Sequence, residues 1–524
     1  MSTKSLTEST LQISGATFFS RILGLLRDVF SASLFGTTAI WDAFLAAFML
    51  PNFLRHLFAE GAFLNSFIPV FTEYLQKRNQ KEARKLANVV FTFLFLILII
   101  MILSGVFLIN LVLAKFSLSP KIFLILSLVR FLLPYILFLF LSALLMGILN
   151  SYKHFITPAF APIFLNIFWI LSLFYLCPLF GDSLEKRIWG VVIGVLLGGL
   201  FQVLIQIPPL VKRKFFLKLN FNFSHPGLKK IILLILPGIF GLAVTQINIV
   251  VDLLLGLFLG NGAISSLWYG NRLMQFPLGV FGIALGTAAL PHYSTYVAKK
   301  EFAELKKTLS FALRIGFFII LPAAVGLIIL RFPIIKLLFQ RGAFTAFSTS
   351  RAANTLFFYC LGLFAYVGVK IVAPVFYSFQ DTKTPVKIAL IAMISNIALN
   401  LILMVPLREG GLALATAISS SLNLFLLLFI LRKKIGNLDE KRILNSFAKI
   451  LISAIIMGIV CKYISFFLLY SSNLSAFISI LVSILSGVVI FILTALILKI
   501  EEAREILGWV KSVIKNVSSK CYNR

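Results

Sequence analysis

The sequence predicts an all-α membrane protein that crosses the bilayer many times, and three observations support this fold class. Of the 524 residues, 60% are hydrophobic and only 13% are charged, far from the composition of a soluble domain. The apolar residues gather in runs long enough to span a bilayer. Several motifs also recur at a nearly constant separation. We therefore expect 14 transmembrane helices, arranged as two pseudo-symmetric six-helix lobes plus two C-terminal helices.

The individual helices follow from the apolar runs, because a spanning helix needs about 20 mostly apolar residues. The first run is long and lacks a small-residue cleavage pattern, so we expect no cleaved signal peptide. Fourteen segments meet the length requirement. In chain order they cover residues 11–36, 38–66, 86–114, 121–150, 158–181, 187–211, 229–259, 263–292, 308–332, 352–379, 385–406, 409–432, 446–470 and 475–499.

Lysine and arginine are distributed unevenly between the connections. The even-numbered connections hold 24 of them and the odd-numbered connections hold nine. Cytoplasmic loops carry the excess of positive charge, so we expect both termini in the cytoplasm. The basic residues of the cytoplasmic connections account for much of the formal net charge of +30. A nucleic-acid partner is not expected, because the basic residues lie in short segments between apolar runs and not on one wettable face.

The internal repeat defines the predicted domains. Pro69 and Tyr74 match Pro291 and Tyr296, each pair standing before a basic segment. The Thr-Pro pairs at 157–158 and 384–385 both open helices, and Asp28 matches Asp252. Six helices per repeat is an even number, so the lobes share one orientation about an axis along the membrane normal. The predicted domains are an N-lobe (1–225), a C-lobe (226–433), a helix pair (434–500) and a cytoplasmic amphipathic tail (501–524).

Several basic residues lie within the expected helices, and four of them are candidate site residues: Arg21, Arg27, Arg55 and Arg272. An arginine at the bilayer centre costs about 2.5 to 3.5 kcal/mol, so these side chains are not expected to face lipid. We expect them to line one central cavity, supported by Asp28, Asp42, Asn52 and Glu60. Arg130, Arg314 and Lys370 are expected near helix ends, where long side chains reach the interface.

The predicted cavity is cationic, because its arginines outnumber the nearby carboxylates. A planar guanidinium offers two parallel donors to a phosphate or diphosphate, so the guest is expected to be a phosphorylated lipid or a nucleotide-like anion. The residues leave one alternative open, in which the arginines pair with the carboxylates and pin helices together. A membrane enzyme is not expected, because the four histidines are dispersed and the four cysteines lack metal-type spacing.

Four stretches carry a family resemblance: FSRILGLLRD, WDAFLAAFMLPNFLRHLFAEGAFLNSFIPVF, TPAFAPIFLNI and NRLMQFPLGVFGIALGTAALP. Through them the chain resembles the MurJ (MviN) family of lipid II flippases, within the multidrug/oligosaccharidyl-lipid/polysaccharide exporter superfamily. The resemblance implies alternating-access translocation of the undecaprenyl-diphosphate-linked peptidoglycan precursor from the cytoplasmic to the periplasmic leaflet of a bacterial inner membrane. It assigns the diphosphate to Arg21, Arg27, Arg55 and Arg272. Another exporter of this superfamily, for polysaccharide lipids or cationic drugs, is the alternative, and a non-transporting scaffold of the cell-wall machinery also remains open.

The resemblance also implies that the last two helices form a groove for the polyprenyl tail. The chain departs from many relatives at Asn271, where an Asp is expected before Arg272. We expect a monomer that contacts lipid II, membrane lipids and cell-wall synthesis proteins, with no cofactor. Coupling to sodium, protons or the membrane potential is left open. A sodium site is one expectation, from oxygen ligands on Asp252, Asn396, Asn400 and Thr416. Interhelical hydrogen bonding by buried amides is the alternative for these residues.

Overall fold

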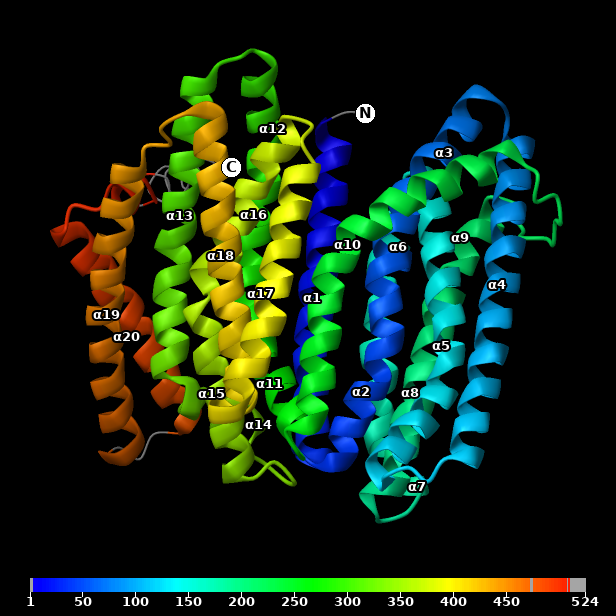
Figure 1. Ribbon diagram of the computed structural model, residues 1–524, viewed down its shortest axis with the longest axis horizontal. Helices are drawn as coiled ribbons and strands as arrows, with labels where there is room; N and C mark the ends of the chain where they lie inside the picture. The colour runs from blue at the N-terminus through cyan, green and yellow to red at the C-terminus, as the bar shows by residue number, and fades with distance from the viewer. Residues whose placement is uncertain (1–2, 472–474, 507, 509–524) are drawn as a thin grey trace, which may run out of the picture. The chain divides into compact units, whose positions relative to one another are not determined.

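The computed structural model describes the backbone of residues 3–471, 475–506 and 508. It also describes their side chains except at 3–14, 17, 58–60, 236–245, 283, 470 and 471. The described residues form helices and connections without a β-strand (Figure 1). They fall into two compact units. Unit 1 holds the described residues up to Ser265 together with 341–345, and unit 2 holds 266–340 and the described residues from Ala346 onward.

Unit 1 contains ten α-helices and two π-helices in its described part, followed by the first turn of an eleventh α-helix. In chain order they are α1 (Thr3–Phe35), α2 (Ala39–Leu54), η1 (Arg55–Phe63), α3 (Leu64–Lys77), α4 (Gln80–Lys115), α5 (Pro120–Ser151), α6 (Ile156–Leu171), η2 (Ser172–Leu176), α7 (Cys177–Leu179), α8 (Leu184–Leu204), α9 (Ile207–Lys212) and α10 (Pro226–Phe258).

Unit 2 begins inside α11 and ends with the residues that follow α20. Its elements are α11 (Ala263–Pro277), η3 (Leu278–Gly282), α12 (Ile283–Ala298), α13 (Phe302–Ile329), α14 (Arg331–Phe339), α15 (Ala346–Leu361), α16 (Leu363–Ser378), α17 (Lys383–Leu407), α18 (Glu409–Ile435), α19 (Glu440–Ser471) and α20 (Ala476–Ile497).

Ten helices among the described residues are long and apolar enough to cross a membrane, and the pair α15 and α16, bent by 42°, makes up to eleven. The predicted class of an all-helical, multi-span membrane protein is therefore confirmed. Three expected spans, 11–36, 38–66 and 229–259, are not among them. The first two contain charged residues, and the third is represented by the shorter apolar helix Gln246–Phe258. The count of 14 and the two-lobe arrangement stay predictions.

In unit 1, α5 packs against α2, α4 and α8, and Figure 1 shows α4, α5 and α8 side by side. α8 presents a row of glycines at positions 190, 194 and 198, which share one helix face. A Cβ atom at Gly190 would lie 2.6 Å from the Cys177 nitrogen, and one at Gly198 would lie 2.8 Å from Leu165 Cα. This row lets α8 approach the backbone of α6 and α7, as small residues do in membrane helix pairs.

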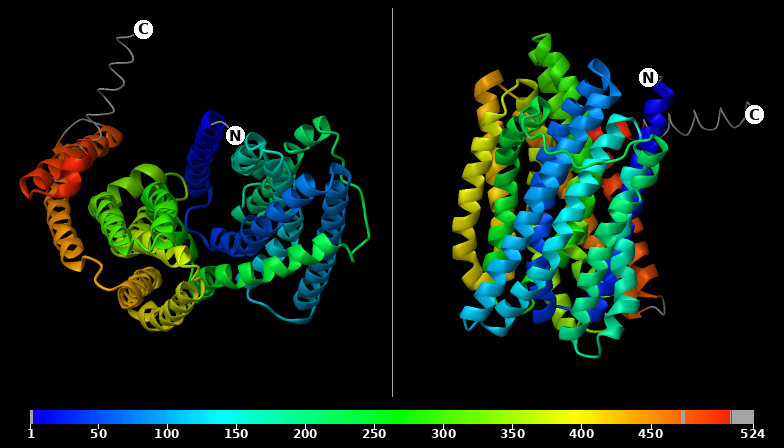
Figure 2. Two further views of the ribbon diagram at one scale, coloured as in Figure 1. Left: turned by 90° about the horizontal axis from the view of Figure 1, so that it is seen from above. Right: turned by 90° about the vertical axis from the view of Figure 1, so that its right-hand side faces the viewer.

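In each unit, a long helical segment is divided into two α-helices by a π-helix. In unit 1 the order is α2, η1 and α3, and in unit 2 it is α11, η3 and α12. A proline precedes each of these two π-helices: Pro51 lies four residues before η1, and Pro277 lies directly before η3. Each proline removes one hydrogen bond to the carbonyl four residues earlier, in the α-helix that leads into the π-helix. Within unit 1, α10 lies along η1 and α3 (Figure 2).

In unit 2, α13 packs against α16 and α19, and α19 packs against α20. Arg314, in the middle of α13, is only 4% exposed. Its Nη1 donates to Glu501 Oε2 over 2.9 Å and also to Glu502. The expectation that Arg314 lies near a helix end and reaches the interface was therefore wrong. The physical reason is that the residues after α20 return to α13 and supply two carboxylates.

We call the group formed by Arg314, Arg442, Glu501 and Glu502 the carboxylate latch. Arg442 Nη2 donates to Glu501 Oε2 over 2.5 Å, so this one oxygen accepts from both arginines. Glu502 is 1% exposed, whereas the side chain of Glu501 is largely exposed. The latch therefore ties α13, the start of α19 and the segment after α20 together within unit 2. Most of the predicted tail, residues 507 and 509–524, lies outside the described residues.

Candidate functional site

Arg27, on α1, is held by a buried polar cluster in unit 1. Its Nη2 and Nε donate to Asp28 Oδ1 over 2.8 and 3.1 Å, and its Nη1 donates to Asn166 Oδ1 on α6 over 3.2 Å. The Asn166 side chain in turn donates to the Ser20 carbonyl over 3.2 Å. Arg27 and Asp28 are 7% and 2% exposed. Two charged residues of the predicted site therefore lie together, and they join α1 to α6.

Trp169, one turn further along α6 than Asn166, completes this cluster. The guanidinium carbon of Arg27 lies 4.4 Å from the centre of the Trp169 ring, within cation–π distance. The indole nitrogen of Trp169 donates to Ser31 Oγ over 3.1 Å. Sequence reasoning did not single out Asn166 or Trp169. The available signal was an amide and an indole inside an otherwise apolar helix, two residue types that seek hydrogen bonds when buried.

Arg21 lies two turns before Asp28 on α1 and differs from Arg27 in its surroundings. Its side chain is half-buried, and the neighbouring Ile22 and Leu26 are about 40% exposed. Among the residues that the structure describes, no hydrogen bond or ion pair engages its guanidinium. Of the two arginines of α1, Arg21 is therefore the one whose N–H groups are available to hydrogen-bond a ligand.

The predicted residues of the second hydrophobic segment lie around the junction of α2 and η1. Arg55 is the first residue of η1, and its Nη2 lies 3.2 Å from the Nε2 of His56. Arg55 is half-buried, as is Asn52 one turn earlier. The side chain of Glu60 lies outside the described residues. Arg55 thus starts the widened turn, where the backbone departs from regular α-helix.

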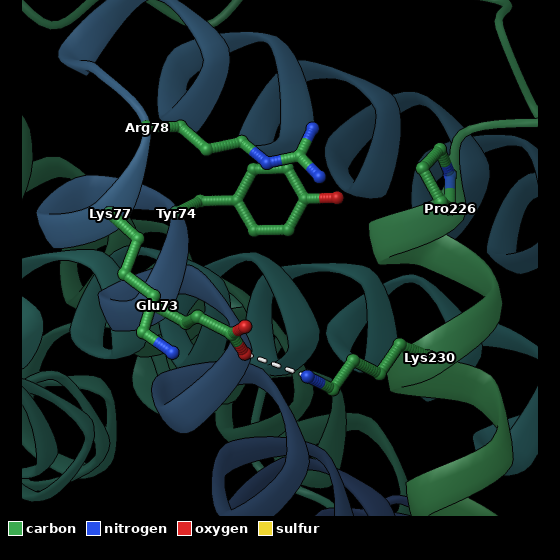
Figure 3. A pocket seen from close by; sticks show the side chains of 6 residues that line it. All are labelled: Glu73, Tyr74, Lys77, Arg78, Pro226 and Lys230. Carbon is green, nitrogen blue, oxygen red and sulfur yellow. Dashed lines mark hydrogen bonds and ion pairs between the residues drawn. The ribbon is translucent and has the colours of Figure 1, made fainter.

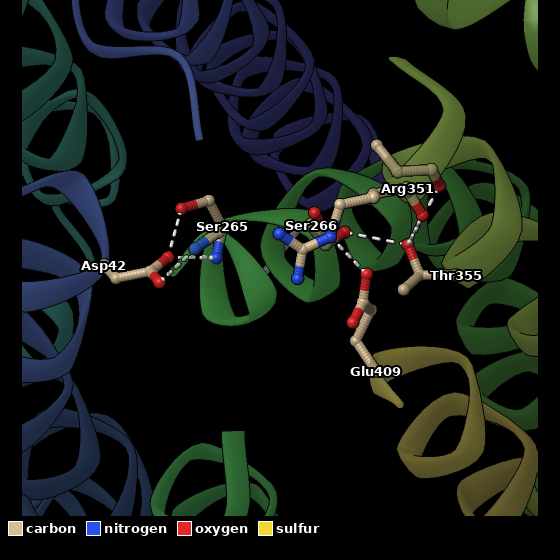
Figure 4. Close-up of polar contacts among 8 residues, drawn as sticks. Asp42, Ser265, Ser266, Arg351, Thr355 and Glu409 are labelled. Carbon is tan, nitrogen blue, oxygen red and sulfur yellow. Dashed lines mark hydrogen bonds and ion pairs between the residues drawn. The ribbon is translucent and has the colours of Figure 1, made fainter. Parts of the chain in front are cut away.

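Asp42 of α2 accepts hydrogen bonds at the first turn of α11, and the residues concerned all belong to unit 1. Its carboxylate accepts from the Gly262 nitrogen over 2.6 Å, from the Ser265 nitrogen over 2.9 Å and from the Ser265 hydroxyl. Figure 4 shows Asp42 facing Ser265. Lys121 Nζ lies 3.7 Å away, and Asp42 itself is fully buried. A carboxylate on the free N–H groups of a helix start is a stabilising arrangement, so Asp42 acts as a cap.

Replacing Asp42 by alanine is expected to lower the free energy of unfolding by about 2 kcal/mol, because the cap at Gly262 and Ser265 is lost. The buried ammonium of Lys121 also loses its counter-charge. Thermal unfolding of the purified chain in detergent measures the effect. Asp182→Ala is the control, because Asp182 is fully exposed in its pair with Arg187. An unchanged unfolding midpoint for the Asp42 variant would contradict the capping role.

Arg272 belongs to unit 2, where it lies half-buried on α11. The neighbouring Asn271, where the family resemblance predicts an Asp, accepts a hydrogen bond from Gln275 Nε2 over 2.5 Å. Of the four arginines assigned to the guest, three therefore belong to unit 1 and one belongs to unit 2. Their meeting in one cavity stays a prediction.

A second buried ion pair in unit 2 was not anticipated from the sequence. Arg351 Nε, on α15, donates to Glu409 Oε1, at the start of α18, over 2.5 Å. Thr355, one turn further along α15, donates to the Ser266 carbonyl over 2.8 Å. Figure 4 shows these four residues. Sequence reasoning could not pair Arg351 with Glu409, because the two residues lie 58 positions apart on different helices.

The residues expected to bind sodium form a hydrogen-bonded network in unit 2. Asn396 Nδ2 donates to Ser419 Oγ over 3.3 Å and to Thr416 Oγ1 over 3.4 Å. Asn400 Nδ2 donates to Asn396 Oδ1 over 3.0 Å. Both amides are fully buried between α17 and α18, which is the arrangement expected for interhelical hydrogen bonding. Asp252, the carboxylate of the set, belongs to unit 1, and the four-residue sodium site stays a prediction.

Comparison with known proteins identifies relatives along nearly the whole chain. Residues 31–494 match the family described as "Lipid II flippase MurJ". The chain is 39% identical over 436 residues to the probable lipid II flippase MurJ of Vibrio cholerae, covering 81% of this chain and 82% of the relative. It is 36% identical over 493 residues to the probable lipid II flippase MurJ of Rickettsia prowazekii, with 92% and 96% covered.

Solved structures give the same result. The structure described as "Lipid II flippase MurJ, inward closed conformation" is 30% identical and covers 93% of this chain and 98% of its own, with a TM-score of 0.76. An inward-facing multidrug resistance MATE transporter of the MOP superfamily, 15% identical with a TM-score of 0.62, shares the fold. The family match over residues 31–494 and the identity to full-length relatives show that this chain belongs to the MurJ family.

Proposed function

We propose that this chain is a lipid II flippase, which moves the undecaprenyl-diphosphate-linked peptidoglycan precursor from the cytoplasmic to the periplasmic leaflet. The observation that carries the proposal is the family match over residues 31–494. The named relatives are transporters and not enzymes, so the chain's task is movement of a lipid without covalent chemistry. The proposed location is a bacterial inner membrane, with both termini in the cytoplasm.

The diphosphate is proposed to bind Arg21, Arg27, Arg55 and Arg272 in a central cavity. Arg21 supports this proposal most directly, because no described residue forms a hydrogen bond or ion pair with its guanidinium. Its planar guanidinium can donate two parallel hydrogen bonds to two phosphate oxygens. Arg27 is proposed to contribute positive electrostatic potential from a fixed place in the cavity wall, since Asp28, Asn166 and Trp169 already hold its side chain. Asp42 supports the site indirectly, by fixing the first turn of α11.

Alternating access is proposed to arise from 14 helices in two lobes. The repeated order of helix, π-helix and helix in α2–η1–α3 and α11–η3–α12 supports this duplication. A duplicated helical frame is a common basis for rocking transporters. The driving force is proposed to be sodium, protons or the membrane potential. Each charge that moves across 100 mV is worth about 2.3 kcal/mol.

The polyprenyl tail is proposed to run along α19 and α20. Both helices carry exposed apolar side chains, among them Phe466, Phe467 and Leu485, each more than half exposed. At the same time the pair is tightly joined, because Cys461 Sγ lies 3.2 Å from the Ser483 carbonyl. An apolar surface on a fixed helix pair can hold a long isoprenoid chain. The protein is proposed to act as a monomer that works beside cell-wall synthesis proteins.

Depletion of the protein in its own bacterium tests the function. Lipid-linked peptidoglycan precursor is expected to accumulate in the inner leaflet within the period of depletion, and re-expression of the chain is expected to clear it. Leaflet position is measured with a membrane-impermeant reagent added to the outside of spheroplasts. Unchanged transbilayer distribution of the precursor, together with failed export of another lipid-linked saccharide or a cationic drug, would instead favour another exporter of the superfamily.

A further inference from the structure

Unit 1 contains a hollow of about 390 Å³ at the C-terminal end of α3 and the N-terminal turn of α10. It is lined by Glu73, Tyr74, Lys77, Arg78, Pro226 and Lys230. Figure 3 shows these side chains converging from the two helices. None of them belongs to the arginine site proposed for the diphosphate.

The hollow carries surplus positive charge. Lys230 Nζ donates to Glu73 Oε2 over 2.7 Å, and this hydrogen bond holds the pKa of the Glu73 carboxyl below its usual value. Glu73 is therefore ionised at neutral pH and neutralises Lys230. Lys77 and Arg78 form no ion pair among the described residues, and the single carboxylate that lines the hollow with them, Glu73, is bonded to Lys230. Two cations thus remain available on one wall.

Tyr74 fixes the orientation of one of these cations. The Arg78 guanidinium carbon lies 4.8 Å from the centre of the Tyr74 ring, over its face. Tyr74 is 6% exposed and its ring centre lies 5.5 Å from that of His225, so the ring under the guanidinium is held in place. Burial lowers the pKa of His225, which is therefore neutral at pH 7. A stacked guanidinium keeps its N–H edge free to donate to two oxygens of a phosphate.

Exposed apolar side chains lie directly beside the hollow on α10. Leu233 and Leu234 are 68% and 47% exposed, and they follow Lys230 by three and four residues. Residues at these spacings share a helix face. A ligand that carries a phosphate next to acyl chains would meet cations and apolar surface together, whereas free phosphate would use only the cations.

We propose that this hollow binds the phosphodiester group of an anionic phospholipid, with Arg78 and Lys77 on the phosphate and the acyl chains along Leu233 and Leu234. Basic pockets at the ends of membrane helices recognise lipid head groups through the same combination of charge and apolar surface. The proposal is independent of which lipid the protein transports. It requires only that the end of α3 lies at a membrane surface.

Unit 2 supplies an internal comparison, a hollow of about 370 Å³ lined in part by Lys306, Lys307 and Arg442. Its cations are largely neutralised: Lys307 pairs with Glu304 over 2.7 Å, and Arg442 pairs with Glu501 over 2.5 Å. The two hollows are similar in size but differ in available charge. Only the hollow of unit 1 is expected to retain an anionic lipid.

Native mass spectrometry of the purified full-length chain, titrated with phosphatidylglycerol or phosphatidylcholine, tests the proposal. The double variant K77A/R78A is expected to weaken phosphatidylglycerol binding at least about tenfold and to leave phosphatidylcholine binding unchanged. The matched variant K306A/K307A removes the same charge from the other hollow and is expected to bind phosphatidylglycerol like the wild type. Millimolar inorganic phosphate is expected not to displace the lipid.

Circular dichroism melting confirms that each variant is folded. If K77A/R78A does not fold, Arg78→Lys takes its place, because it keeps the charge but loses the two-donor edge; a few-fold loss is expected. Equal phosphatidylglycerol affinity in the wild type and the variants of Lys77 and Arg78 would overturn the proposal. An equal loss in K306A/K307A, or displacement of the lipid by inorganic phosphate, would overturn it as well.

Discussion

Replacing Glu502 by alanine is expected to lower the free energy of unfolding by about 3 kcal/mol, because a buried arginine loses one of its two carboxylate partners. Arg314 and Glu502 are 4% and 1% exposed, so water cannot replace the lost partner without opening the packing of α13. Glu501 remains beside Arg314, but Arg442 shares the same oxygen of Glu501. Chemical denaturation of the purified chain in detergent micelles measures the loss.

Two further variants define the origin of this effect. Glu502→Gln keeps an acceptor for Arg314 and is expected to lose less stability than Glu502→Ala. Glu304→Ala removes an exposed partner of Lys307 and is expected to change stability by less than about 0.5 kcal/mol, as exposed pairs usually do. If Glu502→Ala and Glu304→Ala are equally mild, the carboxylate latch does not stabilise unit 2.

Arg21→Ala and Arg27→Ala are expected to abolish transport of lipid II for different physical reasons. Loss of Arg27 removes the 2.8 Å ion pair with the buried Asp28, so the free energy of unfolding is expected to fall by about 3 to 5 kcal/mol together with transport. Arg21 has no described partner to lose, so its variant is expected to keep wild-type stability. The two readouts are translocation of lipid II in proteoliposomes and denaturation of the same preparations.

Arg130→Ala is the matched control for this pair. Arg130 also lies within an apolar helix, but its Nη1 donates to Asn110 at the surface of α4 and α5 over 2.7 Å. Its replacement is expected to leave transport intact. Wild-type translocation by Arg21→Ala would remove Arg21 from the proposed diphosphate site. Wild-type stability of Arg27→Ala would show that the cluster with Asn166 and Trp169 does not hold α1 against α6.

The sequence was sufficient to predict the helical membrane class and the family, because apolar runs and long motifs are local properties of the chain. It also singled out Arg27 and Asp28 as charged residues inside an apolar helix. It could not predict Asn166 and Trp169 as their partners, because these lie about 140 positions away on another helix. The partners of Arg314 were missed for the same reason, since Glu501 and Glu502 follow it by almost 190 positions.

Other features have no local signature at all. The π-helices η1 and η3 look like ordinary helix in hydrophobic pattern, and only the prolines at 51 and 277 hint at a break. The role of Asp42 was also hidden, because a cap is recognised only when the capped helix start is known. Sequence reasoning assigned Asp42 a supporting role at the cavity, which stays a prediction, and could not show that its carboxylate accepts hydrogen bonds from Gly262 and Ser265.

The π-helices η1 and η3 give the helices that contain them a mechanical property that a uniform α-helix lacks. An α-helix turns by about 100° per residue, so a helix that exchanges a π turn for an α turn rotates everything beyond it by about that angle. For η1, the rotated part is α3, and for η3 it is α12. An exchange of this kind at η1 or η3 would therefore turn the part of the helix that follows, α3 or α12, about its own axis relative to the part that precedes it.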